Sequence, residues 1–455
     1  MSMKRQILFI SSILFSAAAM AQSFSGGTGT ATDPYLISNK SDLEELSKLV
    51  DTPGEGDTQQ TYGKYFKLTQ DITDPLTYMI GIEGFFRGDF NGDGHFITVD
   101  IDMPNDDYVG LFGTVKTGAV HDLAVKGSVV GRRYVGGIVA NPTNEALLYN
   151  LANYASVSSS YTSIAYVGGV IGGIISQNSG DLTGATVKNC ANYGTVNCNG
   201  SAVGGVIGYS GQAVGNTISD IANYGYIDNS GVQRVGGAIG NPMWNDKVHR
   251  VANFGILANE NISGCLGNTN PTDLGEIFYD KQYAHNAYAV PAQEKNTAEL
   301  TGTQMEEQLG LGWTYADNLL PRPTMGGLEN SDCAILYATP LLLADGDYLS
   351  NVTKDFKVSL GNASLGNVSW TAKNGLVEIL DDGTVTLKGN GEETLTATLN
   401  GETRDIRLVI NSTNDIKGIA TDKTMKDNVW YNLNGQVVSH PTHGIFIVNG
   451  KKVVK

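Results

Sequence analysis

Two short motifs recur in a fixed order through the middle of this chain. The first centres on Val-Gly-Gly and reads YVGGIV (134–139), YVGGVI (166–171), VGGVIG (203–208) and VGGAIG (235–240). The second reads LANY (151–154), CANY (190–193), IANY (221–224) and VANF (251–254). Successive Val-Gly-Gly valines lie 32, 36 and 32 residues apart. Two markers in one order at one spacing indicate stacked copies of a unit that cannot bury its apolar side alone.

The composition between the markers favours strands over helices. Glycine accounts for 57 of the 455 residues, nearly twice the usual share of about 7%, and short apolar runs separate the glycines. We therefore predict an all-β chain whose centre is a parallel β-solenoid (β-helix), with the apolar positions facing a common core. The asparagines of the second motif are predicted to stack into an internal amide ladder, since buried polar groups need partners: Asn153, Asn192, Asn223 and Asn253.

The N-terminus has the pattern of a secretory signal peptide (1–21). Lys4 and Arg5 precede an apolar stretch and an Ala19-Met20-Ala21 cleavage site, so the mature chain is predicted to begin at Gln22. The apolar stretch is too short for a membrane span. We expect a secreted, extracellular protein, or one displayed on the outer-membrane surface, with no transmembrane segment in the mature chain.

The charge balance is acidic. Removing residues 1–21, which hold two basic and no acidic residues, changes the formal net charge from −16 to −18. Such a surface repels nucleic acid and anionic lipid, so we expect no nucleic-acid partner.

Four cysteines in an exported chain raise the question of disulfides. The repeat register places Cys190 where other copies carry Leu, Ile or Val, and Cys265 where they carry apolar residues. Both are therefore predicted to be small buried hydrophobic residues with free thiols. Cys198 is expected at a polar turn and Cys333 in a linker.

The chain divides by pattern into further segments. Residues 22–70 are predicted as an N-terminal cap with one short helix, which begins at the capping box Ser41-Asp42-Leu43-Glu44. Residues 71–328 are predicted as the solenoid with a C-terminal cap. In 334–411 apolar and polar residues alternate around Trp370, which predicts a small antiparallel β-sandwich. Residues 412–455 are predicted as two hairpins, each turning on Asn-Gly.

Several of these segments resemble known families. The Val-Gly-Gly copies, with YVGLFG (108–113) in front, resemble the GLUG repeat of bacterial surface proteins. Residues 334–411, through VSWTAKNGLVEILDDGTVTLKGNGEETLTATL, resemble a bacterial Ig-like domain. The C-terminal residues resemble the tails of exported Bacteroidetes proteins, including type IX sorting domains. These resemblances imply a repeat protein of the cell surface, with the role of an adhesin.

The same resemblance raises the question of peptidase activity, because GLUG repeats also occur beside IgA-cleaving metallopeptidases. Those enzymes need His-Glu-x-x-His to hold zinc and to supply a base. No histidine of this chain is followed by Glu. The resemblance therefore does not imply peptidase activity for this chain.

One turn has the pattern of a metal site. The sequence DFNGDG (89–94) fits the first half of a calcium loop, with Asp89, Asn91 and Asp93 as candidate ligands. The flanks are strand-like rather than helical, so an ordinary tight turn explains the same residues, and we favour the turn. Calcium is the one cofactor considered.

The remaining candidate residues are carboxylates and aromatics. The coil carboxylates share no register, and the six histidines form no cluster in sequence, so no catalytic residue is assigned: Asp122, Asp181, Asp220, Asp228 and Asp246. The aromatic residues that follow the asparagines form a column, either a packing stack or a platform for sugar rings or a protein partner: Tyr154, Tyr193, Tyr224 and Phe254.

These observations favour a non-enzymatic adhesion or interaction protein. It would present loops of a rigid β-solenoid to glycans or to host or microbial surface proteins. The alternative is a polysaccharide-active enzyme or glycan-binding accessory protein on the same β-helix scaffold. A third hypothesis is a purely architectural spacer.

Overall fold

The computed structural model describes residues 24–54, 60–175, 183–211, 215–230, 234–268, 271–285, 291–342, 349, 358–360, 368–380, 384–411, 429–433, 436–448 and 451–455. The predicted signal peptide, Asp181 and the two Asn-Gly turns of the tail lie outside these residues. The chain forms two compact units, Met1–Ile410 and Asn411–Lys455. In the described part, no helix has the length and apolar character needed to span a membrane.

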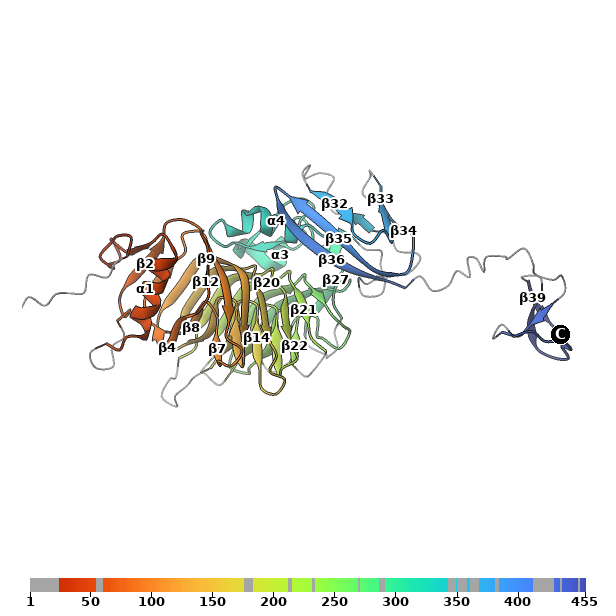
Figure 1. Ribbon diagram of the computed structural model, residues 1–455, viewed down its shortest axis with the longest axis horizontal. Coiled ribbons are helices and arrows are strands. Elements are labelled where there is room, and N and C mark those ends of the chain that lie inside the picture. The colour runs from red at the N-terminus through yellow and green to blue at the C-terminus, as the bar shows by residue number, and fades with distance from the viewer. Residues whose placement is uncertain are drawn as a thin grey trace, which may run out of the picture. The chain divides into compact units, whose positions relative to one another are not determined.

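A parallel β-solenoid forms most of the first unit, as predicted (Figure 1). Equivalent strands of successive coils pair in parallel and in register: β9 (Ala119–Gly131), β12 (Leu147–Asn153), β16 (Thr186–Asn192), β20 (Thr217–Asn223), β24 (Lys247–Asn253) and β26 (Asp273–Asp280). A shorter row continues from the second half of β9: β13 (Ser156–Ser159), β17 (Val196–Cys198), β21 (Tyr226–Asp228) and β25 (Ile256–Leu257).

Two further parallel sheets complete the coils, and the Val-Gly-Gly motif marks the bend between them. The first contains β7 (Tyr108–Val109), β10 (Tyr134–Gly136), β14 (Tyr166–Gly168), β18 (Ala202–Gly204) and β22 (Val235–Gly236). The second contains β4 (Ile80–Phe86), β8 (Phe112–Lys116), β11 (Val139–Thr143), β15 (Ile171–Ile174), β19 (Ile207–Ser210) and β23 (Ile239–Pro242).

The two repeated motifs meet inside each coil. Asn192 Nδ2 donates to Asn223 Oδ1 at 2.8 Å and to the carbonyl of Gly194 at 2.9 Å. The same amide-to-amide bond joins the neighbouring pairs along the row, so the predicted asparagine ladder is confirmed. A Cβ added at Gly169 would lie 2.1 Å from Asn192 Oδ1. Glycine follows Val-Gly at this bend because the ladder leaves no room for a side chain.

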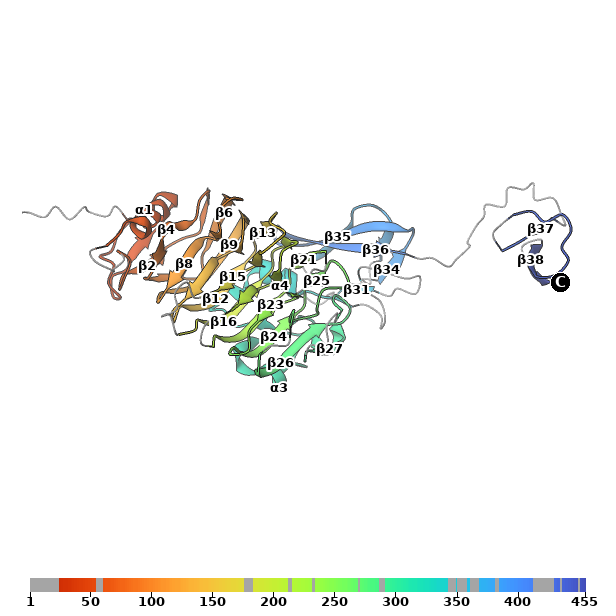
Figure 2. The same ribbon diagram turned by 90° about the horizontal axis from the view of Figure 1, so that it is seen from below.

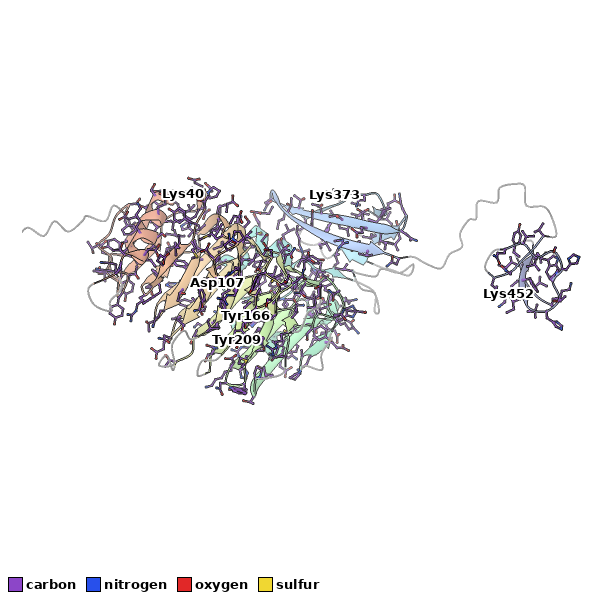
Figure 3. The ribbon with its side chains drawn as sticks, turned by 60° about the horizontal axis from the view of Figure 1, so that its bottom comes forward. Lys40, Asp107, Tyr166, Tyr209, Lys373 and Lys452 are labelled. Atoms are coloured by element: carbon purple, nitrogen blue, oxygen red, sulfur yellow. The ribbon has the colours of Figure 1, made fainter. Side chains whose placement is uncertain are left out.

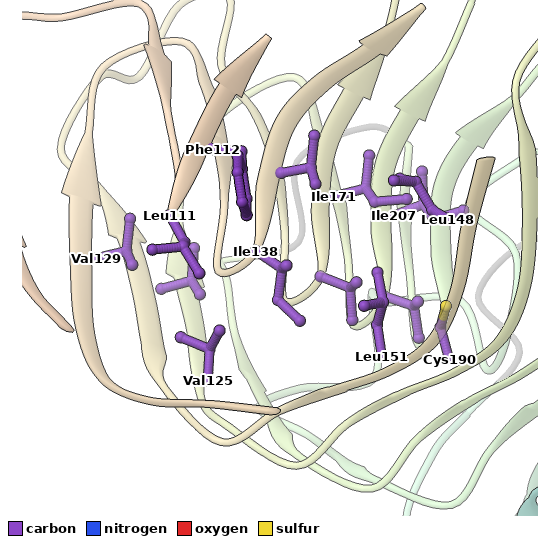
Figure 4. Packing of buried hydrophobic residues seen from close by; sticks show 14 of the residues in the cluster. Leu111, Phe112, Val125, Val129, Ile138, Leu148, Leu151, Ile171, Cys190 and Ile207 are labelled. Carbon is purple, nitrogen blue, oxygen red and sulfur yellow. The ribbon is translucent and has the colours of Figure 1, made fainter. Parts of the chain in front are cut away.

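Stacked aliphatic rows fill the interior of the coils (Figure 4). Leu151 and Cys190 are neighbours in one row, and both are completely buried. Cys265 takes the place that Ala238 holds one coil earlier, as predicted. All four cysteines are free and buried.

The local predictions for the other two cysteines were wrong. Cys198 ends strand β17 at the position that Ser159 holds one coil earlier, and it faces inward. Cys333 lies in helix α4 (Asp332–Ala338). Polar neighbours suggested exposed positions for both cysteines: Cys198 lies between two asparagines, and Cys333 follows Asp332. In a strand or a helix, however, a buried residue can lie next to an exposed one.

Helix α1 (Lys40–Asp51) lies at the N-terminal end of the solenoid (Figure 2), and its apolar face joins the core. The prediction that this helix begins at a capping box at Ser41 was wrong. Asn39 is the N-cap, and its side chain accepts a hydrogen bond from the Asp42 backbone N–H at 3.1 Å. Asp42 is buried and accepts from the Ser25 hydroxyl at 2.7 Å. The first coils contain β1 (Tyr35–Ile37), β2 (Tyr65–Leu68), β3 (Ile72–Leu76), β5 (Asp89–Asn91) and β6 (Phe96–Asp102).

Residues 297–338, here called the covering segment, run back along one side of the solenoid. They follow β27 (Gln293–Lys295) and contain α2 (Thr297–Leu300), α3 (Glu306–Leu309), β28 (Trp313–Thr314), β29 (Arg322–Pro323) and α4. Their apolar residues pack on a row of small side chains of the coils: Ala124, Ala152, Ala191, Ala222 and Ala252. Much of the region predicted as a terminal cap therefore covers a lateral face, because the alanine row leaves space for it.

Small antiparallel sheets follow the solenoid, as predicted. One contains β30 (Leu341–Leu342), β31 (Val358–Leu360), β34 (Thr384–Leu387) and β33 (Val377–Ile379); the other contains β32 (Ser369–Ala372), β35 (Gly391–Leu399) and β36 (Glu402–Ile410). Trp370 is half-buried between two apolar clusters. The second unit holds a separate antiparallel sheet of β37 (Trp430–Tyr431), β38 (Ile445–Val448) and β39 (Lys451–Val454).

Candidate interaction surface

A partly exposed row of tyrosines crosses four coils on the outside of the solenoid. Tyr108, Tyr134 and Tyr166 share one register on β7, β10 and β14. Tyr209 on β19 of the next coil continues the row, and Figure 3 labels it beside Tyr166. Successive ring centroids are 4.7, 5.1 and 4.6 Å apart. All four side chains are half-buried, and we call them the tyrosine ladder.

The ladder follows from one position of the repeat. In a strand, the residue before a buried valine points to the opposite face, so Val135 faces the core and Tyr134 faces outward. The next coil carries Ala202 in this register, which leaves the far face of the Tyr166 ring open to Tyr209. The signal in the sequence was the tyrosine before Val-Gly in three successive copies. The asparagine motif carries a second aromatic column, and only the structure shows which of the two columns stays at the surface.

Charged residues lie at the Tyr108 end of the ladder. The Asp107 carboxylate accepts from Arg132 Nε at 2.5 Å and also from Arg133. The hydrogen bond from Arg132 is the main cause that lowers the pKa of Asp107 to about 2. Arg132 also lies 5.7 Å from the ring of Tyr161, which is exposed. This end therefore holds a preorganised group of ionised side chains.

The chemistry that the ladder offers is set by its stacking. Burial and the adjacent tyrosines raise the pKa of Tyr134 to about 12, so its phenol is neutral at physiological pH. The rings of Tyr108 and Tyr134 and those of Tyr166 and Tyr209 stack face to face, whereas Tyr134 and Tyr166 are tilted by 47°, and each side chain keeps part of its surface in solvent. Such a surface can donate and accept hydrogen bonds over several coils. Because the rings are already held in place, a partner orders few side chains on binding.

The aromatic column predicted from the sequence is a stack, and it lies under the covering segment. Its rings are 4.7, 5.0 and 5.3 Å apart. Tyr224 donates to the Pro321 carbonyl, and Trp313 packs edge-on against Phe254. Tyr193, Tyr224 and Phe254 are at most 1% exposed. A ligand would reach these rings only if the covering segment moved away, so their binding role stays a prediction.

The three candidate calcium ligands point to different partners. Asp89 Oδ1 lies 3.1 Å from His121 Nε2, and Asp93 pairs with Lys67 at 3.0 Å. Asn91 Oδ1 accepts from the Asp93 backbone N–H at 2.7 Å and closes the turn. Among the residues that the structure describes, no group of three or more His, Cys, Asp and Glu side chains is placed to hold a metal ion. Calcium binding at this turn stays a prediction.

The expectation that no carboxylate register recurs was wrong. Asp122 and Asp220 occupy one column, together with Asn150, Asn189, Arg250 and Glu276. All six residues have left-handed backbones, with φ between 53° and 59°, which places an extra outward residue in each strand. The column lies directly before the apolar-Ala-Asn motif, where all four copies carry a polar residue, so the signal is present in the sequence.

Two carboxylates of the early coils converge on one histidine. His121 Nδ1 lies 2.6 Å from Asp122 Oδ2, and its Nε2 contacts Asp89. Burial lowers the pKa of His121, but the hydrogen bonds to both carboxylates outweigh it and raise the pKa to about 9. The imidazole is therefore protonated at neutral pH. It is 7% exposed and stacks on Tyr149, whereas the side chains of Asp89 and Asp122 are 35% and 26% exposed, so the carboxylates of this network remain partly open to solvent.

Comparison with known proteins assigns no ligand or activity. No family model matches the chain, so the GLUG, Ig-like and sorting-domain resemblances stay predictions. A 138-residue stretch is 31% identical to the "Putative Gly-rich membrane protein" of Evansella cellulosilytica, over 27% of this chain and 15% of that protein. The chain thus spans a small part of this relative. The "Crystal structure of a putative immunoglobulin A1 protease" from Bacteroides ovatus is 18% identical with a TM-score of 0.44, covering 66% of this chain and 95% of that chain.

Proposed function

We propose that this protein is a secreted or surface-displayed, non-enzymatic interaction protein that binds glycans or surface proteins through the tyrosine ladder. The observation that carries the proposal is the half-exposed stack of four tyrosines with paired arginines at one end. Tyrosine and arginine are the residues most enriched where proteins bind partners. The ladder uses a lateral face of the coils rather than the loops expected from the sequence.

The solenoid suits this role because it holds the ladder rigidly. Each ladder tyrosine lies within a strand, and three of these strands, β10, β14 and β19, pair in parallel on both sides. The asparagine ladder and the closely packed glycines fix the spacing of the coils. A partner with a repeating structure would therefore meet equivalent groups at a constant interval.

The alternative, a polysaccharide-active enzyme, depends on two accessible carboxylates. Glycoside hydrolysis needs a pair separated by about 5–10 Å with space for a sugar or a water between them. Asp89 and Asp122 converge and are partly exposed, but both carboxylates pair with His121, which lies between them. This observation favours the non-enzymatic proposal. Release of reducing ends from a glycan panel by the purified chain would contradict it.

Binding of the full chain to arrays of glycans and extracellular-matrix proteins tests the proposal. The double variant Tyr134→Ala/Tyr166→Ala should lose about tenfold or more in affinity for any neutral glycan or protein found to bind. Trp244→Ala is the matched control, since Trp244 is 62% exposed and lies outside the ladder. Unchanged binding by the double variant, or no binding by the parent chain to either array, would overturn the proposal. The latter would favour the spacer hypothesis.

A further inference from the structure

A second surface, at one corner of the solenoid, has the features of a binding groove. It lies where β2, β5, β9 and β12 begin, so it crosses four successive coils. Strand spacing of 4.7–4.9 Å gives it a length of roughly 14 Å. Its volume is about 420 Å³, and its lining includes Tyr62, Lys64, Arg87, Thr117, Glu145 and Leu147. We call it the corner groove, and it shares no residue with the tyrosine ladder.

Arg87 indicates what the corner groove binds. Its guanidinium lies 4.5 Å from the centre of the Tyr62 ring. In the described part of the chain it has no carboxylate partner, and its Nε is buried without a hydrogen bond. Four other arginines each pair with a carboxylate: Arg132, Arg133, Arg250 and Arg407. Arg322 and Arg404 also donate to carbonyls rather than to a carboxylate, but both are buried, whereas Arg87 stacks on a ring that is 57% exposed.

The chemistry of such an arginine selects a carboxylate. A planar guanidinium that is held by stacking presents its N–H groups as a fork, which matches the two oxygens of a carboxylate. Lys64 adds a second positive charge to the same groove, and the Asp89 carboxylate, which also lines it, pairs with His121. A carboxylate on a ligand would therefore complement Arg87 and Lys64 here.

The rest of the lining suits a sugar ring. The Tyr62 side chain is 57% exposed, so the ring keeps open surface although the guanidinium covers part of it. Aromatic surface packs against the apolar face of a pyranose, while Glu145, which is exposed across the groove, accepts hydrogen bonds from hydroxyl groups. We propose that the corner groove binds an acidic glycan of the uronate type. The carboxylate lies on Arg87 and Lys64, and the sugar ring lies on Tyr62.

An acidic peptide fits the groove less well. The backbone at this corner is already paired, because Asp89 N–H donates to the Lys64 carbonyl at 2.8 Å and Leu147 N–H donates to the Gly118 carbonyl at 2.9 Å. No strand edge is therefore free in the groove for an added strand. Glu145 would also repel a run of acidic side chains, whereas it complements hydroxyl groups.

Titration calorimetry with a pair of matched ligands tests the proposal. The full chain is titrated with an oligogalacturonate and with its methyl ester, in which each carboxylate carries a methyl group and has lost its charge. We expect the acid to bind, and we expect the affinity for the ester to be lower by about tenfold or more. Arg87→Gln and Tyr62→Ala should each weaken binding of the acid by about tenfold. Added salt should weaken it further.

The control variants separate this site from the tyrosine ladder. Arg407→Gln removes an exposed arginine from the antiparallel sheets, and Tyr134→Ala/Tyr166→Ala disrupts the ladder; neither should change binding of the acid. Thermal melting checks that Arg87→Gln folds as the parent does. Four outcomes would overturn the proposal: no heat with the acid, equal binding of the ester, unchanged binding by Arg87→Gln, or equally tight binding of poly-glutamate.

Discussion

At the scale of single residues, the buried asparagines determine how the coils join. Asn153, Asn192 and Asn223 each donate both to the next asparagine and to the carbonyl two residues ahead, so these buried amide nitrogens keep their hydrogen bonds. Asn192→Asp keeps the shape of the side chain and removes both donors. We expect it to lower the free energy of unfolding by about 2–4 kcal/mol. Urea unfolding measures the change, and Asn199→Asp, at an exposed position, should change it little.

Asp280 links stability to pH. Burial raises its pKa from 3.8 to about 7. Between these values the unfolded chain releases the proton and the folded chain keeps it, so this group makes stability fall as pH rises through that window. Asp280→Asn should remove this slope and stabilise the protein at pH 8 by up to about 4 kcal/mol. Urea unfolding at pH 4 and pH 8 measures it; an Asp280→Asn profile parallel to that of the parent would contradict the assignment.

At the scale of the elements, the bend between the two outer sheets depends on its second glycine. A Cβ at Gly169 would meet the Asn192 amide and, at 2.3 Å, the Gly205 carbonyl. Neither can withdraw without breaking the ladder or the coil pairing. Gly169→Ala should therefore cost at least about 2 kcal/mol, measured by chemical unfolding. Gly26→Ala is the control, since the nearest atom there, 3.1 Å away, belongs to the movable Leu36 side chain.

At the scale of the whole molecule, the covering segment joins the solenoid to the antiparallel sheets. Arg404 on β36 is 5% exposed, stacks on Tyr337 and donates to the carbonyls of Tyr337 and Thr339. Its removal leaves two buried carbonyls without a donor. Arg404→Met should destabilise the first unit by about 2–4 kcal/mol and divide its unfolding into two transitions.

Calorimetric melting distinguishes this effect from a loss of surface charge. Arg407→Met, three residues along the same strand, removes an exposed pair with Glu392. It should change stability by less than about 1 kcal/mol. Equal melting of the two variants would show that Arg404 does not couple the parts.

The repeat, and hence the parallel solenoid, can be predicted from the residues alone, because equal registers stack wherever a unit must bury its apolar side against its neighbour. The asparagine ladder, the core positions of Cys190 and Cys265, and the antiparallel strands after Ala334 can be predicted in the same way, since each of these depends on short-range periodicity. Which outer surfaces stay open depends on contacts between segments that are distant in the sequence. The covering segment buries the column that ends in Phe254, while the tyrosines before Val-Gly remain at the surface.

The same reason explains the grooves and clusters. Arg87 and Glu145 reach one corner from different coils, and His121 collects carboxylates from two coils. The loop lengths and the left-handed residue in each strand determine which side chains meet in this way. The spacing of the repeat does not reveal either feature. Local periodicity therefore specifies what lies inside a coil, whereas contacts between distant segments specify what a partner can reach.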